Sequence, residues 1–217
     1  MADFSRETPR GTKLIVFDFD GTIADTPALI LQCVNELSAK YGYAPIEDAE
    51  KMRGKSILAM VREDLGISWW RLWRFSRELT ELVRSRPQGV MLVRGMAEAL
   101  QKLQQTHQTG LATSNSESFV KSVLEKEQWE RMSFVRAGIP LFGKKRALQK
   151  ILKEKGSSFE KIVYVGDEVR DIKACQAVGI SVVAVSWGLN SKEALLAHGP
   201  DALVETPEEL EKLFAEF

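Results

Sequence analysis

Residues 13–26 read KLIVFDFDGTIADT, an apolar run that ends in two carboxylates, a glycine and a threonine. The continuous apolar residues 14–17 are typical of a strand buried on both faces, and therefore of the centre of a parallel sheet. Ligands of open α/β sheets bind at the carboxyl ends of the strands, which is where Asp18 and Asp20 stand. Two like charges this close are costly, so the pair indicates a divalent metal, a raised carboxyl pKa, or both.

The rest of the chain alternates between apolar strands and helical patterns. Short apolar runs predict further strands over residues 109–113, 134–137, 162–165, 181–185 and 201–204. Strands that alternate with helices predict a doubly wound parallel α/β sheet, with the first strand central. Between this first strand and about Arg94 no further buried strand is evident, and helical patterns recur instead over residues 28–41, 46–52, 56–65 and 69–85. We therefore expect a flexible lead-in over residues 1–12. An α/β core over residues 13–26 and 95–217 follows, and an all-helical insertion over residues 27–94 interrupts it.

Composition and charge exclude several classes of function. The chain has 217 residues, 44% of them hydrophobic, and its 30 basic and 30 acidic side chains cancel. This balance argues against a nucleic-acid-binding protein or one that binds an anionic membrane surface. No apolar run approaches the roughly eighteen residues of a membrane span, and the N-terminus has no signal-peptide pattern, which predicts a cytoplasmic protein. Cys33 and Cys175 have no metal-ligand spacing and are expected to be buried, reduced thiols.

The paired carboxylates at residues 18 and 20 suggest a reaction at phosphorus. A carboxylate can attack phosphorus to give an acyl phosphate. A neighbouring carboxylic acid can protonate the departing alkoxide and then take a proton from the water that hydrolyses this intermediate. Further polar groups follow later strands, with Ser114 and Asn115 after residues 109–113 and Asp167 and Asp171 after residues 162–165.

Four sequence clusters in order resemble the motifs of the haloacid dehalogenase superfamily of phosphotransferases. They are DFDGT at 18–22, SN at 114–115, a lysine in FGKKRAL near 144, and GDEVRD at 166–171. The resemblance extends from Lys13 onward and is nearest to the subfamily of phosphoglycolate phosphatase and β-phosphoglucomutase, which carries a helical cap over a Rossmann-like core. It implies that Asp18 is the nucleophile and Asp20 the general acid/base. It also implies that Ser114 hydrogen-bonds the phosphoryl group, while Thr22 and Asn115 line the same pocket.

The resemblance also implies a Mg²⁺ site. Asp167 would bind Mg²⁺ directly together with Asp18 and the backbone carbonyl of Asp20, while Asp171 would bind through water or orient the motif lysine. Lys144 fits that lysine best, and Lys145 is the competitor. A fixed cation is needed here because several carboxylates converge on an incoming phosphate anion. The role of Glu168 stays open.

The insertion offers two further features. Arg53 and Lys55, in the sequence MRGKS, could bind an anionic substrate when the cap closes, or form a solvated turn. The aromatic cluster of Trp69, Trp70 and Trp73, with Phe75, is expected to pack between the cap helices, with a dimer face or a hydrophobic substrate pocket as alternatives. In the core, Trp187 falls at a strand end, where it either packs or borders the pocket.

These observations predict a Mg²⁺-dependent phosphatase that hydrolyses a small phosphorylated metabolite through an aspartyl-phosphate. A sugar phosphomutase of the same superfamily is the alternative, and a phosphate- or partner-binding protein with a residual site is a more distant one. Dehalogenation is disfavoured because it needs neither a metal nor a second acid, and the chain keeps Asp20 and Asp167. The identity of the phosphomonoester, and the choice between monomer and homodimer, stay open.

Overall fold

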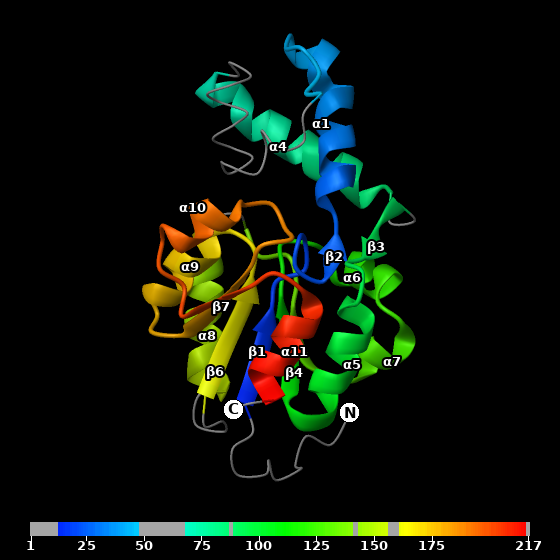
Figure 1. The fold of residues 1–217 in the computed structure, drawn as a ribbon. Helices are drawn as coiled ribbons and strands as arrows, with labels where there is room; N and C mark the ends of the chain where they lie inside the picture. Colours follow the sequence, from blue (N-terminus) through cyan, green and yellow to red (C-terminus); the bar gives the residue numbers. More distant parts are fainter. Residues whose placement is uncertain (1–12, 48–67, 87–88, 141–142, 156–160, 216–217) are drawn as a thin grey trace.

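The structure is a computed structural model that describes residues 13–47, 68–86, 89–140, 143–155 and 161–215. Its main element is a six-stranded parallel sheet with the strand order β5-β4-β1-β6-β7-β8 (Figure 1). The strands are β1 (Lys13–Phe17), β4 (Gln108–Ala112), β5 (Met132–Arg136), β6 (Lys161–Gly166), β7 (Ser181–Val185) and β8 (Ala202–Val204). β1 pairs with a neighbour on each side, so its predicted central position is confirmed.

Two apolar layers cover the two faces of the sheet. Ile15 and Phe17 of β1 belong to one layer, with buried side chains of α5 (Met96–Thr106), α6 (Glu117–Val123) and α11 (Pro207–Ala215). Leu14 and Val16 belong to the other layer, with α8 (Lys144–Lys155), α9 (Val169–Gln176) and α10 (Lys192–Leu196). The short helix α7 (Lys126–Glu130) precedes β5. Both faces are covered by helices, which confirms the predicted doubly wound architecture.

The strand order places a crevice between β1 and β6. The chain runs from β1 to β4 and β5 on one side, and then continues with β6, β7 and β8 on the other side. The order therefore reverses between β1 and β6, and this switch point is where doubly wound sheets bind ligands. Phe17 at the end of β1 is paired with Val165 near the end of β6, so the residues that follow these strands meet at one edge.

Helices α1 (Pro27–Tyr41) and α4 (Trp69–Arg84) pack on each other beyond the carboxyl ends of the strands (Figure 1). Two short strands, β2 (Ala24–Asp25) and β3 (Met91–Leu92), connect this pair to the core as an antiparallel ribbon. This ribbon was not among the predicted elements. Two-residue strands carry too little hydrophobic pattern to be recognised in a sequence.

The helix predicted over residues 46–52 is wrong at its start. Ile46 is not helical, because the Asn35 side chain accepts a hydrogen bond from its backbone N–H (2.7 Å) and donates one to its carbonyl oxygen (2.9 Å). The backbone groups of Ile46 are thereby satisfied without a helix. The remainder of this predicted helix, and the one over 56–65, lie outside the described residues.

The aromatic cluster of α4 does not pack as predicted. The buried stripe of this helix consists of Leu72, Phe75, Leu79 and Val83, which recur at the spacing of one helical face. Trp70 and Trp73 fall off that stripe and are 80% and 70% exposed. The packing role is therefore confirmed for Phe75 and wrong for Trp70 and Trp73, while the side chain of Trp69 lies outside the described part of the structure.

The two cysteines and the lengths of the helices can be compared with what the sequence predicted. Cys33 and Cys175 are both buried free thiols, as predicted. In the part of the chain that the structure describes, no helix combines the length and the apolar character needed to cross a bilayer.

Candidate active site

Three buried carboxylates converge at the switch point between β1 and β6. Asp18 directly follows β1, Asp167 directly follows β6, and Asp171 lies in the first turn of α9. One oxygen from each side chain lies within 4.8 Å of the others. The parallel pairing of β1 with β6 brings Asp18 and Asp167 together across the sheet, although they are far apart in the sequence.

Lys144 bridges two of these carboxylates. Its Nζ lies 2.6 Å from Asp18 Oδ2 and 2.5 Å from Asp171 Oδ1. Burial by itself lowers the pKa of Lys144, but the adjacent Asp171 and Asp18 carboxylates outweigh it and hold that pKa well above its usual range. Lys144 is buried and Lys145, the competitor for this position, is exposed. The geometry therefore selects Lys144 as the fixed cation beside Asp18.

Asp20 occupies a separate position two residues beyond Asp18. Its Oδ2 accepts a hydrogen bond from Asn115 Nδ2 at 2.7 Å. Its Oδ1 is buried and has no hydrogen-bond partner among the described residues. Burial, and then the charge of Asp18, raise the pKa of Asp20 to about 6, although the hydrogen bond from Asn115 lowers it. A carboxyl group with this pKa can both donate and accept a proton near neutral pH.

The Asp167 side chain is held by hydrogen bonds to both carboxylate oxygens and lies close against two glycines. Its Oδ1 accepts a hydrogen bond from Thr22 Oγ1 at 3.0 Å, and its Oδ2 accepts one from the backbone N–H of Leu189 at 2.7 Å. A Cβ atom added at Gly21 or at Gly188 would lie 2.2 Å from Asp167 Oδ2, so no larger residue fits on either side. Gly21 also has a φ of 70°, which favours glycine in the turn that follows Asp20.

The donor set fits a hard divalent cation. The three clustered side chains offer carboxylate oxygens only, which are the ligands that Mg²⁺ prefers. Burial, followed by the charge of Glu168, raises the pKa of Asp167 well above its usual range, and burial raises that of Asp171 to about 6. Carboxylates in this situation are stabilised in their ionised form by a bound cation. The buried Oδ1 of Asp20 is a further oxygen that lacks a protein partner among the described residues.

The other predicted site residues have different outcomes. Asn115 contacts Asp20, and Ser114 precedes it in the turn after β4, where it is partly buried. Ser116, the next residue, caps α6 by accepting a hydrogen bond from Phe119 N at 3.3 Å. Thr22 contacts Asp167. Arg53 and Lys55 lie outside the described residues, so their role in substrate binding stays a prediction.

Two contacts at the site involve residues whose roles the sequence left open. Glu168, whose role was open, accepts a hydrogen bond from Arg170 Nε at 2.8 Å, and this pair adds a second cation beside the acidic cluster. The loop after β7 supplies the Leu189 contact to Asp167 and a hydrogen bond from Trp187 Nε1 to Thr22 O at 3.0 Å. Gly188 in this loop was the available signal, since glycine at a strand end often marks a close backbone approach.

Comparison with known proteins agrees with this geometry. A family model described as haloacid dehalogenase-like hydrolase matches residues 15–185. The chain is 33% identical over 200 residues to a phosphoglycolate phosphatase of Synechococcus elongatus, covering 90% of this chain and 94% of that protein. It is 26% identical over 196 residues to a 5′-nucleotidase of Pseudomonas aeruginosa, covering 86% and 88% respectively.

A solved structure shows the same fold. It is a haloacid dehalogenase-like family hydrolase of Streptococcus pneumoniae, which superimposes with a TM-score of 0.76 at 17% identity and covers 94% of this chain and 99% of that one. The family match, over residues 15–185, reaches from β1 through β7 of the sheet and includes Lys144 and the three clustered carboxylates. The chain therefore belongs to the haloacid dehalogenase-like hydrolases and is a phosphatase-like enzyme of that family.

Proposed function

We propose that this enzyme hydrolyses a small phosphomonoester, with Mg²⁺ as cofactor and through an aspartyl-phosphate on Asp18. The observation that carries the proposal is the buried cluster of Asp18, Asp167 and Asp171 around Lys144, with Asp20 next to it. Mg²⁺, held by Asp18 and Asp167 with Asp171 nearby, would supply positive charge to the transferring phosphoryl group.

In the first step, Asp18 forms a bond to phosphorus while the bond from phosphorus to the ester oxygen breaks. Asp20 gives its proton to that oxygen, so the alcohol leaves neutral. The pKa of about 6 for Asp20 supports this role, because a substantial fraction of the group is protonated at mildly acidic to neutral pH. Lys144 offsets the negative charge of Asp18 and lets the phosphate anion approach it.

In the second step, the ionised Asp20 takes a proton from water. The resulting hydroxide attacks phosphorus, the bond to Asp18 breaks, and inorganic phosphate leaves with the Asp18 carboxylate restored. Asn115 holds the Asp20 carboxylate by the 2.7 Å hydrogen bond and keeps it directed in both steps. We assign Ser114 to a hydrogen bond with the phosphoryl group.

The relatives guide the choice of substrate. A phosphoglycolate phosphatase is similar over nine-tenths of the chain, so 2-phosphoglycolate is the first ester to test. A 5′-nucleotidase is also similar, which makes nucleoside monophosphates the second class. We propose that the α1–α4 pair belongs to a helical cap over residues 27–94 that selects among them, and that the enzyme acts in the cytoplasm.

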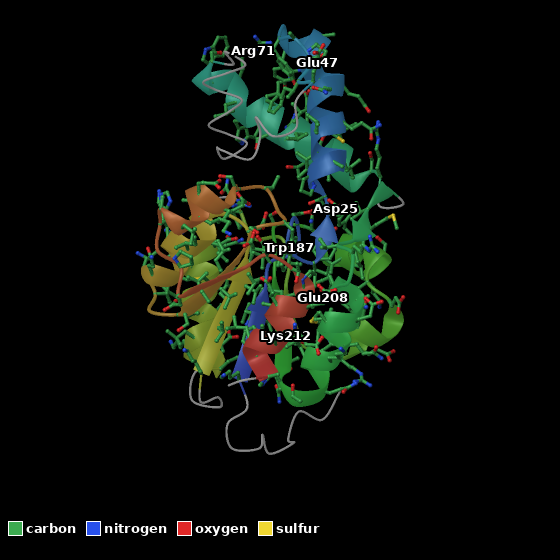
Figure 2. All side chains as sticks on the ribbon, in the orientation of Figure 1. Asp25, Glu47, Arg71, Trp187, Glu208 and Lys212 are labelled. Carbon is green, nitrogen blue, oxygen red and sulfur yellow. The ribbon has the colours of Figure 1, made fainter. Side chains whose placement is uncertain are left out.

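The test is phosphate release from a panel of small esters by the wild type, Asp18→Asn and Asp25→Asn. Asp25 is an exposed carboxylate of β2, in the ribbon that connects the α1–α4 pair to the core (Figure 2). Its variant therefore controls for the loss of one negative charge. Release should need Mg²⁺, stop with EDTA, be lost in Asp18→Asn and persist in Asp25→Asn. Release by Asp18→Asn at the wild-type rate would contradict the proposal. Isomerisation of a sugar phosphate without release would favour the phosphomutase.

A further inference from the structure

The loop after β7, residues 186–190, donates hydrogen bonds to the turn after β1 and to Asp167. Trp187 donates through Nε1 to the carbonyl oxygen of Thr22 at 3.0 Å. Leu189 N–H donates to Asp167 Oδ2 at 2.7 Å, and Asn190 N–H donates to the backbone carbonyl oxygen of Asp167 at 3.3 Å. One short segment thus contacts both the turn after β1 and the end of β6.

Thr22 connects these contacts to each other. It is fully buried, and its Oγ1 donates to Asp167 Oδ1 at 3.0 Å, while its carbonyl oxygen accepts from Trp187. Hydrogen bonds therefore run from Trp187 to Thr22, from Thr22 to Asp167, and back to the loop through Leu189. This closed ring fixes both oxygens of the Asp167 carboxylate.

The ring leaves little space for adjustment. Gly188, between Trp187 and Leu189, approaches Asp167 so closely that an added Cβ would lie 2.2 Å from Oδ2 and 2.3 Å from Cβ. A shift of the loop toward Asp167 would therefore displace the carboxylate. Figure 2 places Trp187 between the carboxyl end of the sheet and the ribbon that leads to α1. Its ring is partly buried against the apolar core, so packing anchors the ring while its N–H holds Thr22.

We propose that Trp187 is a positioning residue for the metal site, acting on Asp167 through Thr22. The inference rests on the proposed Mg²⁺-dependent function. Mg²⁺ requires nearly ideal octahedral geometry, so its affinity depends on how precisely a ligand is oriented. Each Asp167 oxygen keeps a free lone-pair direction after its protein hydrogen bond, which leaves the carboxylate able to bind a cation.

The test compares Mg²⁺ binding to the wild type, Trp187→Phe and Trp129→Phe by isothermal titration calorimetry. Trp187→Phe keeps an aromatic ring and removes the N–H donor. Trp129 is a partly buried tryptophan of α7, so Trp129→Phe makes the same chemical change elsewhere. We expect Trp187→Phe to weaken Mg²⁺ binding about ten-fold, the effect typical of residues that orient metal ligands. Trp129→Phe should bind as the wild type does. Equal affinity in all three proteins would overturn the inference.

Kinetics give a second readout. The Mg²⁺ concentration for half-maximal activity should rise about ten-fold in Trp187→Phe. KM for the ester at saturating Mg²⁺ should stay within about two-fold, because a residue that acts only on metal affinity has no effect once the metal site is full. A change confined to KM would overturn the positioning role.

A second variant tests the same chain of hydrogen bonds if Trp187→Phe fails to fold. Thr22→Val removes the hydroxyl and should weaken Mg²⁺ binding by at least as much. Where Trp187→Phe does fold, the double variant should bind Mg²⁺ no more weakly than Thr22→Val alone, because both changes act on the same chain of hydrogen bonds. A double variant whose loss of Mg²⁺ affinity equals the product of the two single losses would contradict the inference. If the wild type binds Mg²⁺ but hydrolyses no ester, the proposed function fails while the calorimetric result still stands; if it binds no Mg²⁺, the inference is overturned.

Discussion

At the scale of single residues, Lys144 is buried between two carboxylates and has little contact with water. The net stability gained from such a pair is small, because removing the charges from water costs about as much as their attraction returns. Removal of one partner lowers the stability considerably, because it leaves an uncompensated charge in the interior. Lys144 therefore contributes to folding as well as to the proposed chemistry.

We predict that Lys144→Met lowers phosphate release by at least about 100-fold and lowers the free energy of unfolding by about 3 kcal/mol. The activity falls because the phosphate must then approach Asp18 without the fixed cation, and the stability falls because Asp18 and Asp171 repel each other. Steady-state kinetics and urea unfolding measure the two effects. Lys145→Met is the matched control, since Lys145 is exposed, and should change stability by less than about 0.5 kcal/mol. A larger effect at Lys145 than at Lys144 would reverse the assignment.

At the scale of elements, α1 and α4 meet through an apolar stripe and an ionic contact. Glu78 of α4 accepts a hydrogen bond from Lys40 of α1 at 2.6 Å and one from Arg74 of α4 at 3.0 Å. These hydrogen bonds, that from Lys40 first, lower the pKa of Glu78 to about 2. Lys40 and Glu78 are 38 positions apart in the sequence, and their contact joins α1 to α4.

The lowered pKa predicts a pH-dependent contribution to stability. Because the folded-state pKa of Glu78 lies below its usual value, the contribution is complete above about pH 4.5 and is lost as the pH falls toward 2. Glu78→Gln should therefore lower Tm at pH 7, and its difference from the wild type should shrink between pH 4.5 and pH 2. Thermal unfolding followed by circular dichroism measures this.

Glu81→Gln provides the comparison for the Glu78 variant. Glu81 is 67% exposed and lies 3.7 Å from Arg77 on the same helix, a surface pair of little energetic value. It should leave Tm nearly unchanged at both pH values. A Tm difference for Glu78→Gln that stays constant down to pH 2 would show that Glu78 acts by packing and not by charge.

At the scale of the whole molecule, the sheet assembles the site at one edge. Asp18, Ser114 with Asn115, and Asp167 each follow a different strand, and Lys144 begins the helix α8 that covers one face. These segments meet only in the folded chain. A ligand that binds all of them must therefore stabilise the folded state relative to the unfolded one.

We predict that Mg²⁺ at about 100 times its Kd raises the free energy of unfolding by about 2.7 kcal/mol. For a chain of this size, that corresponds to a rise in Tm of roughly 5–10 °C, which differential scanning calorimetry measures. Asp167→Asn should abolish the rise, EDTA should reverse it, and Asp25→Asn should keep it. An equal rise in Asp167→Asn would place the metal elsewhere.

The sequence determined the core strands and most of the site because their signals are local. A continuous apolar run such as residues 14–17 predicts a strand buried on both faces, and the glycine and carboxylates that follow it predict a turn at a crevice. Motif order likewise favours Lys144 over Lys145 without any knowledge of the contacts. Local patterning misled for Trp70 and Trp73, because hydrophobic residues were expected to be buried wherever they cluster. Among the side chains of α4 that the structure describes, the buried ones form the stripe of Leu72, Phe75, Leu79 and Val83.

Tertiary structure alone decided which side chains hold the carboxylates. Trp187 contacts Thr22 across 165 residues of sequence, and Asn115 contacts Asp20 across 95. No local pattern encodes such pairs, because they depend on the order of strands in the sheet and on the path of each loop at its edge. The ribbon of β2 and β3 arises in the same way, from two short segments that acquire hydrogen-bond partners only when the α1–α4 pair returns to the core.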